Sequence, residues 1–571
     1  MARKLRKISE RFGTLITYAS MFEKWPRPED LNDRLRQLSR TDVLLRLAWC
    51  SALTLTWKIV KDNEADRRVR DYLFPFWAEE FRGWTTIYGE GFVFSRFTVL
   101  WLMRHAFIVC PTDGARLDRE EHFRIFGEAC LIANDLSAFT NPKPLPTDLA
   151  VAANMLPNTE YFSQEDFDRD IARTLYMLND LAPNATGPRL PALAHRLQEL
   201  LGYTVTDYCD LAVACAMNPL AVDTTNVKDF QIPTLMPEQF TTTSVSAETA
   251  ERFLHLISAD ENTFQNTITE SDTHQADLTV FRDKPLLDHN KTRVPLDTGF
   301  ILDKAGRSLF WTALKNCPDP EERKKILGSY GYLVEQYLNR LFMASLGPTS
   351  TFLAAPCFRD GAQAFDGAVR ENGILIVMEY KASTINSVIR YADDPPALER
   401  VLEERFIQGE GQGYGRKGMA QLFHAIKRFT EGNALIVQSV GIEVMPDRIH
   451  TIMPVLVHLD NALRTPGIPH YMTERFKNLG RFKQHTVTPM ILLPITELEE
   501  LEGHLRENPL SAFLESFLTL LRSDRAAVFL TRILPLLRGQ RRKVGGTINR
   551  YDEYLNQLTQ RLFLSPPSKP S

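Results

Sequence analysis

The amino-acid sequence predicts an α/β fold, in which a mixed sheet flanked by helices follows a large all-helical N-terminal domain and precedes a helical C-terminal cap. Apolar residues recur at helical spacing through residues 1–225, where strand signals are few. Short apolar runs typical of strands gather between residues 350 and 495. A chain of 571 residues is also too long for one ordinary domain.

The expected domains follow from where the helix-like and strand-like patterns occur along the chain. We place a helical N-terminal domain at 1–225, a linker and mixed lead-in at 226–325, the core with the sheet at 326–495, and the helical cap at 496–571. Phe230–Thr249, rich in proline and threonine, is the clearest boundary. The runs "NALIVQSVGIEV" and "IHTIMPVLVHL" are expected to extend the sheet, and "TVTPMILLPIT" to add a last strand.

Composition excludes several classes of protein. The 44% hydrophobic and 24% charged residues are typical of a globular chain, and the net charge of −4 gives no general attraction to nucleic acid. Seven cysteines without a CxxC pair favour a reducing compartment, so we expect a cytoplasmic protein. The apolar stretch Phe92–Cys110 carries Arg96 and Arg104, which favours a buried helix over a membrane span. No GxxxxGK[ST] occurs, so any ATP-driven step would need a partner subunit.

A predicted β-hairpin places charged residues together. Asn372-Gly373 separates two apolar runs, and this dipeptide is the strongest short-range signal for a type I′ hairpin turn. Pairing outward from the turn brings Asp366 opposite Glu379, with Cβ atoms roughly 5 Å apart. Side chains alternate along a strand, so Lys381 shares the face of Glu379.

Opposed carboxylates destabilise a sheet unless a cation lies between them. Oxygen ligands suit Mg²⁺, with Mn²⁺ as the alternative, so the hairpin reads as half of a metal site. The alternative interpretation is a solvated rim of the sheet, where Lys381 is a simple ion-pair partner.

Two helices are expected to flank the hairpin. Gly328–Phe342 has apolar residues at helical spacing with Glu335 beside them, and Arg416–Phe429 repeats the pattern and carries Gln421. Either polar residue is equally well interpreted as an ordinary helix-surface residue. The order is therefore helix with Glu, strand with Asp, strand with Glu-x-Lys, and helix with Gln.

This order resembles the PD-(D/E)XK nuclease superfamily, whose fold is that of restriction endonucleases, over residues 329–437. Phe365 stands where the family usually has proline or a small residue. The resemblance implies that Asp366, Glu379 and the backbone carbonyl of Tyr380 bind Mg²⁺ and that Lys381 activates water. It also implies that Glu335 orders a second metal ion. Gln421 would position the lysine or the substrate phosphate.

The resemblance implies phosphodiester hydrolysis, with DNA as the favoured partner. The chain resembles a large prokaryotic member acting in restriction or phage defence, with an ATPase subunit or a second copy of itself as further partners. Its N-terminal domain would sense a signal, bind a partner or bind nucleic acid. The alternative is an inactive nuclease-fold scaffold that binds nucleic acid or protein. The basic residues expected at the nucleic-acid backbone are Arg416, Lys417, Arg538, Arg541, Arg542 and Lys543; those of the last run could equally form a solvated surface.

Overall fold

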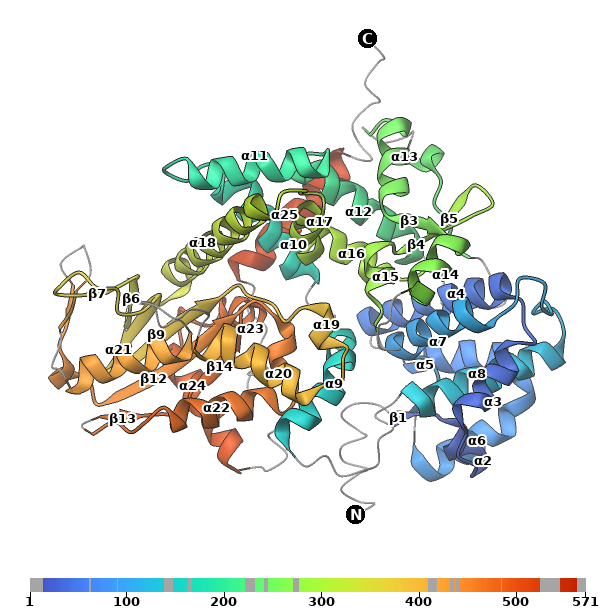
Figure 1. The fold of residues 1–571 in the computed structure, drawn as a ribbon, viewed down its shortest axis with the longest axis horizontal. Coiled ribbons are helices and arrows are strands. Elements are labelled where there is room, and N and C mark those ends of the chain that lie inside the picture. The colour runs from blue at the N-terminus through green and yellow to red at the C-terminus, as the bar shows by residue number, and fades with distance from the viewer. Residues whose placement is uncertain are drawn as a thin grey trace, which may run out of the picture. The chain divides into compact units, whose positions relative to one another are not determined.

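The computed structural model describes residues 14–60, 63–89, 91–137, 147–162, 167–220, 232–240, 245–270, 277–408, 418–431, 435–437, 442–483, 485–523 and 545–561. The chain folds into two units (Figure 1). Unit 1 comprises Met1–Pro144, Asp207–Leu309 and Asn556–Ser571; unit 2 comprises Leu145–Thr206 and Phe310–Leu555. Helices predominate and the largest sheet is mixed, so the predicted α/β class is confirmed at that level.

Unit 1 is mainly helical. Its helices are α2 (Tyr18–Phe22), α3 (Pro28–Leu35), α4 (Arg40–Val60), α5 (Asn63–Leu73), η1 (Pro75–Trp77), α6 (Ala78–Tyr88), α7 (Arg96–Val109), α8 (Glu120–Ser137), α12 (Val205–Leu220), η4 (Pro237–Phe240), α13 (Ala247–Leu256), α14 (Glu261–Glu270), α15 (Thr279–Asp283), α16 (Thr298–Ala305) and α17 (Arg307–Lys315), of which α12 and α17 cross into unit 2. Its strands are β1 (Thr14–Leu15) and β2 (Gly91–Phe92), which pair, and β3 (Ser258–Asp260), β4 (Leu286–His289) and β5 (Thr292–Pro295), which form a small sheet.

The apolar stretch in the middle of unit 1 is the buried helix α7, as predicted. Ser95 caps its first turn by accepting the N–H of Thr98. Arg96 is buried and forms an ion pair with Asp297, which explains how a charged residue fits in this stretch. Among the described residues, no helix combines the length and the apolar character that crossing a membrane requires.

Unit 2 contains the mixed sheet. The strand order is β13-β12-β9-β8-β6, and β14 also pairs with β12. The strands are β6 (Ser350–Ala354), β8 (Gly367–Glu371), β9 (Ile374–Lys381), β12 (Thr451–His458), β13 (Thr486–Val487) and β14 (Ile491–Pro494). Neighbours among β6, β8 and β9 are antiparallel, whereas β12 runs parallel to β9, β13 and β14.

The helices of unit 2 pack on this sheet or on one another (Figure 1). They are α9 (Asp148–Phe162), α10 (Phe167–Leu175), the π-helix η3 (Tyr176–Leu181), α11 (Arg189–Leu201), α18 (Pro320–Ser345), α19 (Ser387–Arg390), α20 (Pro395–Leu402), the π-helix η5 (Glu403–Ile407), α21 (Met419–Glu431), η6 (Pro446–Arg448), η7 (Asn461–Arg464), α22 (Ile468–Asn478), α23 (Ile495–Leu501), α24 (Leu510–Ser523) and α25 (Gly546–Thr559). Glu371 fixes α24 to the hairpin, since its carboxylate accepts the N–H groups of Leu510 and Ser511.

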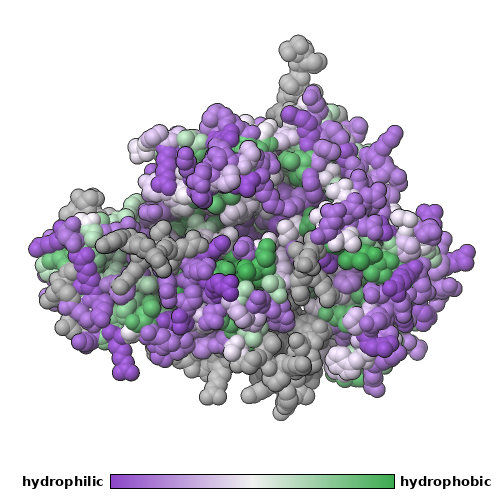
Figure 2. Space-filling model, in the orientation of Figure 1, coloured by the Kyte–Doolittle hydropathy of each residue, from purple (hydrophilic) through white to green (hydrophobic). Residues whose placement is uncertain are grey.

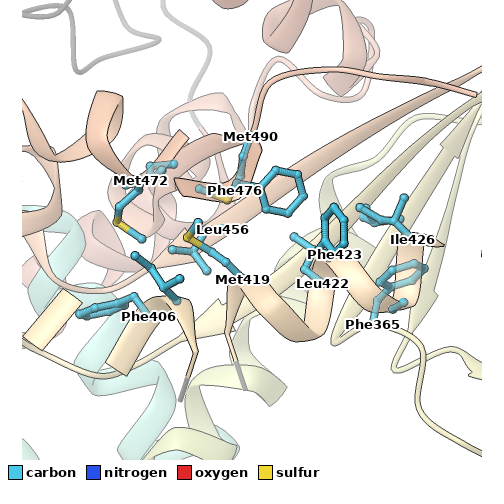
Figure 3. Packing of buried hydrophobic residues seen from close by; sticks show 14 of the residues in the cluster. Phe365, Phe406, Met419, Leu422, Phe423, Ile426, Leu456, Met472, Phe476 and Met490 are labelled. Atoms are coloured by element: carbon cyan, nitrogen blue, oxygen red, sulfur yellow. The ribbon is translucent and has the colours of Figure 1, made fainter. Parts of the chain in front are cut away.

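The two faces of the sheet pack against different helices. On one face, α21 shares a hydrophobic core with alternate residues of the strands, including Ala368 and Val377. Figure 3 shows side chains of this core, among them Phe365 and Phe423. On the other face, Phe342 of α18 stacks on Phe352 of β6, with ring centroids 5.2 Å apart. The sheet is therefore covered by α21 on one side and by α18 on the other.

Two segments differ from the expectation. Residues 145–206, placed by sequence in the N-terminal domain, belong to unit 2, because α9 contributes Leu149, Ala152 and Leu156 to the core of the sheet. The run "NALIVQSVGIEV" does not extend that sheet in its described part. It forms only the two-residue strands β10 (Ile436–Val437) and β11 (Glu443–Val444), which make a separate small sheet with β7 (Cys357–Phe358).

The visible surface is mainly hydrophilic (Figure 2), as expected for a chain with an apolar core. On the face shown in Figure 2, hydrophilic residues cover most of the coloured surface, and hydrophobic residues form smaller patches between them. Single exposed apolar residues need no functional explanation. The polar residues that the sheet brings together are therefore the better candidates for a functional site.

Candidate active site

The Asn-Gly turn fixes the register of the β8–β9 hairpin. Asn372 and Gly373 have φ angles of 41° and 79°, as a type I′ turn requires. Glu371 pairs with Ile374 and Gly367 with Met378, so the predicted register is confirmed. Glu379 and Lys381, at the carboxyl end of β9, consequently lie on one face of the sheet.

Asp366 lies one residue before β8 and is not part of the regular ladder, which ends at the Gly367–Met378 pair. Its backbone N–H donates to the carbonyl of Met378 at 3.1 Å. Its Oδ2 accepts the N–H of Tyr380 at 2.8 Å, and its Oδ1 accepts from Nε2 of Gln363 at 3.0 Å. The expected direct cross-strand pair with Glu379 is therefore replaced by a bend that carries the Asp366 side chain to the end of β9.

The Asp366 carboxylate lies beside Glu379, because it accepts the N–H of the next residue, Tyr380. Burial, with the neighbouring Asp366 charge second, raises the pKa of Glu379 to about 7. Burial also raises the pKa of Asp366, while the hydrogen bond from Tyr380 and the charge of Lys381 oppose that rise. The neighbouring Glu379 side chain also opposes the rise in the pKa of Asp366, as a smaller cause.

Lys381 and the start of α21 supply the positive partners of Glu379. Nζ of Lys381 lies 2.8 Å from Oε1 of Glu379, and the lysine side chain is only 14% exposed. The backbone N–H of Gly418 donates to the same oxygen at 3.2 Å. A nearly buried glutamate is thus held between a cation and a backbone donor, which offsets part of its desolvation.

Glu335 lies on α18 and approaches Asp366. It is half-buried, and burial followed by the charge of Asp366 raises the pKa of Glu335 to about 7. The Glu335 carboxyl group is therefore within electrostatic reach of Asp366. In the part of the chain that the structure describes, no three His, Cys, Asp or Glu side chains converge closely enough to hold a metal ion by themselves.

The chemistry of the donors nevertheless fits a hard divalent cation. Asp366 and Glu379 offer carboxylate oxygens whose mutual repulsion a cation would relieve, and the carbonyl of Tyr380 is a third oxygen on the same strand. Only two side chains supply this set, and Lys381 already contacts one of them. Further ligands would have to be water or substrate oxygens, as is usual for Mg²⁺.

The other expected site residues are less well defined. Gln421 lies in the first turn of α21 and is half-buried, and no hydrogen bond joins it to Asp366, Glu379 or Lys381 in the described structure. Arg416 and Lys417 lie outside the described residues. The same holds for the basic run of Arg538, Arg541, Arg542 and Lys543.

Gly367 and the side chain of Tyr380 are parts of the site that sequence reasoning missed. A Cβ atom on Gly367 would lie 2.2 Å from the Tyr380 hydroxyl, so no larger residue fits there without movement. That hydroxyl is buried without a hydrogen-bond partner among the described groups. A glycine directly after the aspartate was the available signal, since glycine in a strand often marks a close approach.

His458 and Asp460 form a second feature beside Lys381. His458 is the β12 residue in register with Lys381 and is 1% exposed. Its Nδ1–H donates to the carbonyl of Asp460 at 2.9 Å, and burial lowers the pKa of His458 to about 3, so the ring is neutral. Asp460 accepts the N–H of Ile385 at 2.6 Å and a bond from Arg390 at 3.0 Å, which fixes the chain that follows Lys381.

Comparison with known proteins adds no relative to this picture. No protein-family profile, no curated protein and no solved structure matches the chain. The resemblance to the PD-(D/E)XK superfamily therefore depends on the residues around the β8–β9 hairpin alone.

Proposed function

We propose that this chain is a metal-dependent nuclease that hydrolyses phosphodiester bonds, with DNA as the favoured substrate. One observation carries the proposal. The Asp366 carboxylate accepts the N–H of Tyr380 and so lies beside Glu379 at the end of a central strand, with Lys381 at 2.8 Å from Glu379. A sheet needs no such pair for stability, because like charges placed together destabilise it.

Each residue has a proposed role. Asp366, Glu379 and the Tyr380 carbonyl would hold Mg²⁺ or Mn²⁺, which would supply a Lewis acid that polarises a phosphoryl oxygen. Lys381, held in place by Glu379, would orient the attacking water and place a positive charge near the phosphate. Glu335 and Gln421 would order further water or a second cation.

The proposed biological setting follows from the resemblance. A large prokaryotic nuclease of this class would serve as an effector in restriction or phage defence in the cytoplasm. An ATPase subunit, or a second copy of the chain, would be its partner.

A second candidate is an inactive scaffold with a nuclease-like core. It is favoured by the absence of a three-residue metal cage among the described residues and by the direct contact of Lys381 with Glu379. In this case the lysine, and not a metal ion, would neutralise the glutamate permanently.

Incubation of the purified chain with plasmid, single-stranded DNA and RNA, with and without Mg²⁺, distinguishes the two candidates. The nuclease proposal expects Mg²⁺-dependent cleavage that is lost in Glu379→Gln, which keeps the size of the side chain. Glu443→Gln is the matched control, because Glu443 is an exposed glutamate of the same unit. Binding of nucleic acid without cleavage under all conditions would support the scaffold instead.

A further inference from the structure

An arginine and a tyrosine form a small exposed surface next to Glu335. Helices α11 and α18 lie side by side in unit 2 (Figure 1). Arg189, the first residue of α11, donates from Nε to Oγ of Ser329 at 3.3 Å and from Nη2 to the carbonyl of Gly328 at 2.7 Å. Its guanidinium carbon lies 5.3 Å from the centroid of the Tyr332 ring. We call Arg189 and Tyr332 the Arg–Tyr platform.

The platform borders the proposed active site. Tyr332 and Glu335 are three residues apart on α18, so their side chains are neighbours on the helix surface. Arg189 is close enough that its charge opposes the rise in the pKa of Glu335. Tyr332 remains 38% exposed, whereas Glu335 is half-buried beside it.

The charge of Arg189 is not neutralised by its neighbours. Both of its described acceptors, a hydroxyl and a backbone carbonyl, are neutral oxygens, and no ion pair joins it to Glu335 in the described structure. An exposed guanidinium held rigidly in position is well suited to bind phosphate. An exposed aromatic ring beside it is the feature on which an unpaired base stacks.

We propose that the Arg–Tyr platform binds a single-stranded segment of the nucleic-acid substrate beside the scissile bond, with a phosphate on Arg189 and a base on Tyr332. This inference rests on the proposed nuclease function, because the platform lies beside the active site only if Glu335 is part of that site. It names an unpaired strand, and not an intact duplex, as the substrate at this position, since bases in a duplex are not free to stack on a side chain.

A structural role is the alternative, since Arg189 also links α11 to α18. The chain offers a matched control in Arg196, which lies two turns along the same helix and also contacts α18, through Glu322 at 2.8 Å. Arg196 forms ion pairs with two glutamates, Glu322 and Glu199, so its charge is already neutralised and is not expected to bind phosphate. Loss of either arginine removes a link between the helices, but only Arg189 is expected to contact the substrate.

The test is the affinity of the full chain for a labelled single-stranded oligonucleotide and for the matching duplex, measured by fluorescence anisotropy without divalent metal. We expect Arg189→Ala and Tyr332→Ala each to weaken single-strand binding about tenfold. Tyr332→Phe, which keeps the ring, and Arg196→Ala are expected to bind as the wild type does. The slope of log affinity against log salt should fall by about 0.7 in Arg189→Ala, as one lost phosphate contact on a single strand predicts.

Several results would overturn the inference. These are equal losses in Arg189→Ala and Arg196→Ala, unchanged binding in Tyr332→Ala, or no single-strand binding by the wild-type chain. The outcome is separate from that of the nuclease proposal. If the chain binds single strands through the platform but cleaves nothing, the platform inference stands and the nuclease proposal is rejected. If cleavage depends on Glu379 but the platform variants bind normally, the nuclease proposal stands and the platform inference is rejected.

Discussion

The carboxylate of Asp366 accepts the backbone N–H of Tyr380 at 2.8 Å, so an acidic side chain satisfies a main-chain donor at the very end of the β8–β9 ladder. A regular strand would use a backbone carbonyl at this position. Because a side-chain carboxylate replaces the backbone carbonyl as acceptor, the chain can bend before β8. The bend places the Asp366 side chain beside Glu379. Substitutions of Asp366 should therefore keep an acceptor, and Asp366→Asn is a better probe of chemistry than Asp366→Ala.

The first prediction concerns stability. Glu379 binds its proton more tightly in the folded chain, because its pKa is raised from 4.5 to about 7. The free energy of unfolding of the wild type should then fall as pH rises from about 4.5 through 7, by up to about 3 kcal/mol. Glu379→Gln keeps the acceptor for Lys381 and removes this loss, so without metal it should be more stable than the wild type at pH 8 and similar at pH 4.

Urea denaturation at both pH values, in a chelating buffer, measures this difference. Glu443→Gln, at an exposed position, should show no comparable gain. If Glu379→Gln were less stable than the wild type at pH 8, the carboxyl pair would not be a source of strain and the argument for a cation site would lose its basis.

The hairpin illustrates what the sequence can predict. Turn chemistry is local, so Asn372-Gly373 determined the turn type, the register and the common face of Glu379 and Lys381. The helices that carry Glu335 and Gln421 also follow from local periodicity. What periodicity could not predict was the end of the ladder at Gly367, since that depends on the Asp366 carboxylate, which accepts the N–H of Tyr380 in place of a backbone carbonyl.

Contacts between distant segments also could not be predicted from the sequence. Residues 145–206 read as part of a helical domain, yet α9 adds apolar residues such as Leu149 and Leu156 to the core of the sheet. Nothing near Arg189 in the sequence indicates α18, 139 residues further along the chain, as its partner. Such pairings depend on tertiary packing, which local patterns do not encode.

The second prediction tests the close approach of Gly367 to Tyr380. Gly367→Ala should destabilise the chain by roughly 1–3 kcal/mol, because the new methyl group meets the Tyr380 hydroxyl. Tyr380→Phe should be neutral or stabilising, since that hydroxyl is buried without a partner among the described residues. The double substitution should cost less than Gly367→Ala alone, which a double-mutant cycle in urea measures. Additive effects would show that the two groups do not meet.

The third prediction separates metal binding from the chemical step. Lys381→Met removes the ammonium group from Glu379, so the affinity for Mg²⁺ or Mn²⁺ should be kept or increased. Cleavage should nevertheless fall by about 100-fold or more, as expected when a group that orients water or stabilises charge is lost. Asp366→Asn should instead lower both. Calorimetric metal titrations beside cleavage assays measure the split, and equal loss of metal affinity in both variants would remove Lys381 from its proposed role.

The fourth prediction concerns acid stability and His458. Burial lowers the pKa of this histidine from 6.5 to about 3, so it stays neutral in the folded chain while the unfolded chain takes up a proton below pH 6.5. The stability it contributes is therefore present above pH 6.5 and lost as pH falls, by about 2 kcal/mol at pH 5. Asn at this position can keep the donor to the Asp460 carbonyl without titrating in this range.

His458→Asn should consequently lose less stability than the wild type between pH 7.5 and pH 5, although the smaller side chain lowers its stability at both values. The measurement is a urea midpoint series across this range, with His424→Asn on the exposed surface of α21 as the control. His424→Asn should follow the wild-type slope, because it leaves the buried His458 ring in place. An unchanged slope in His458→Asn would mean that the ring is protonated in the folded chain. It would then bring a second positive charge beside Lys381 and change the electrostatics of the site on which the nuclease proposal depends.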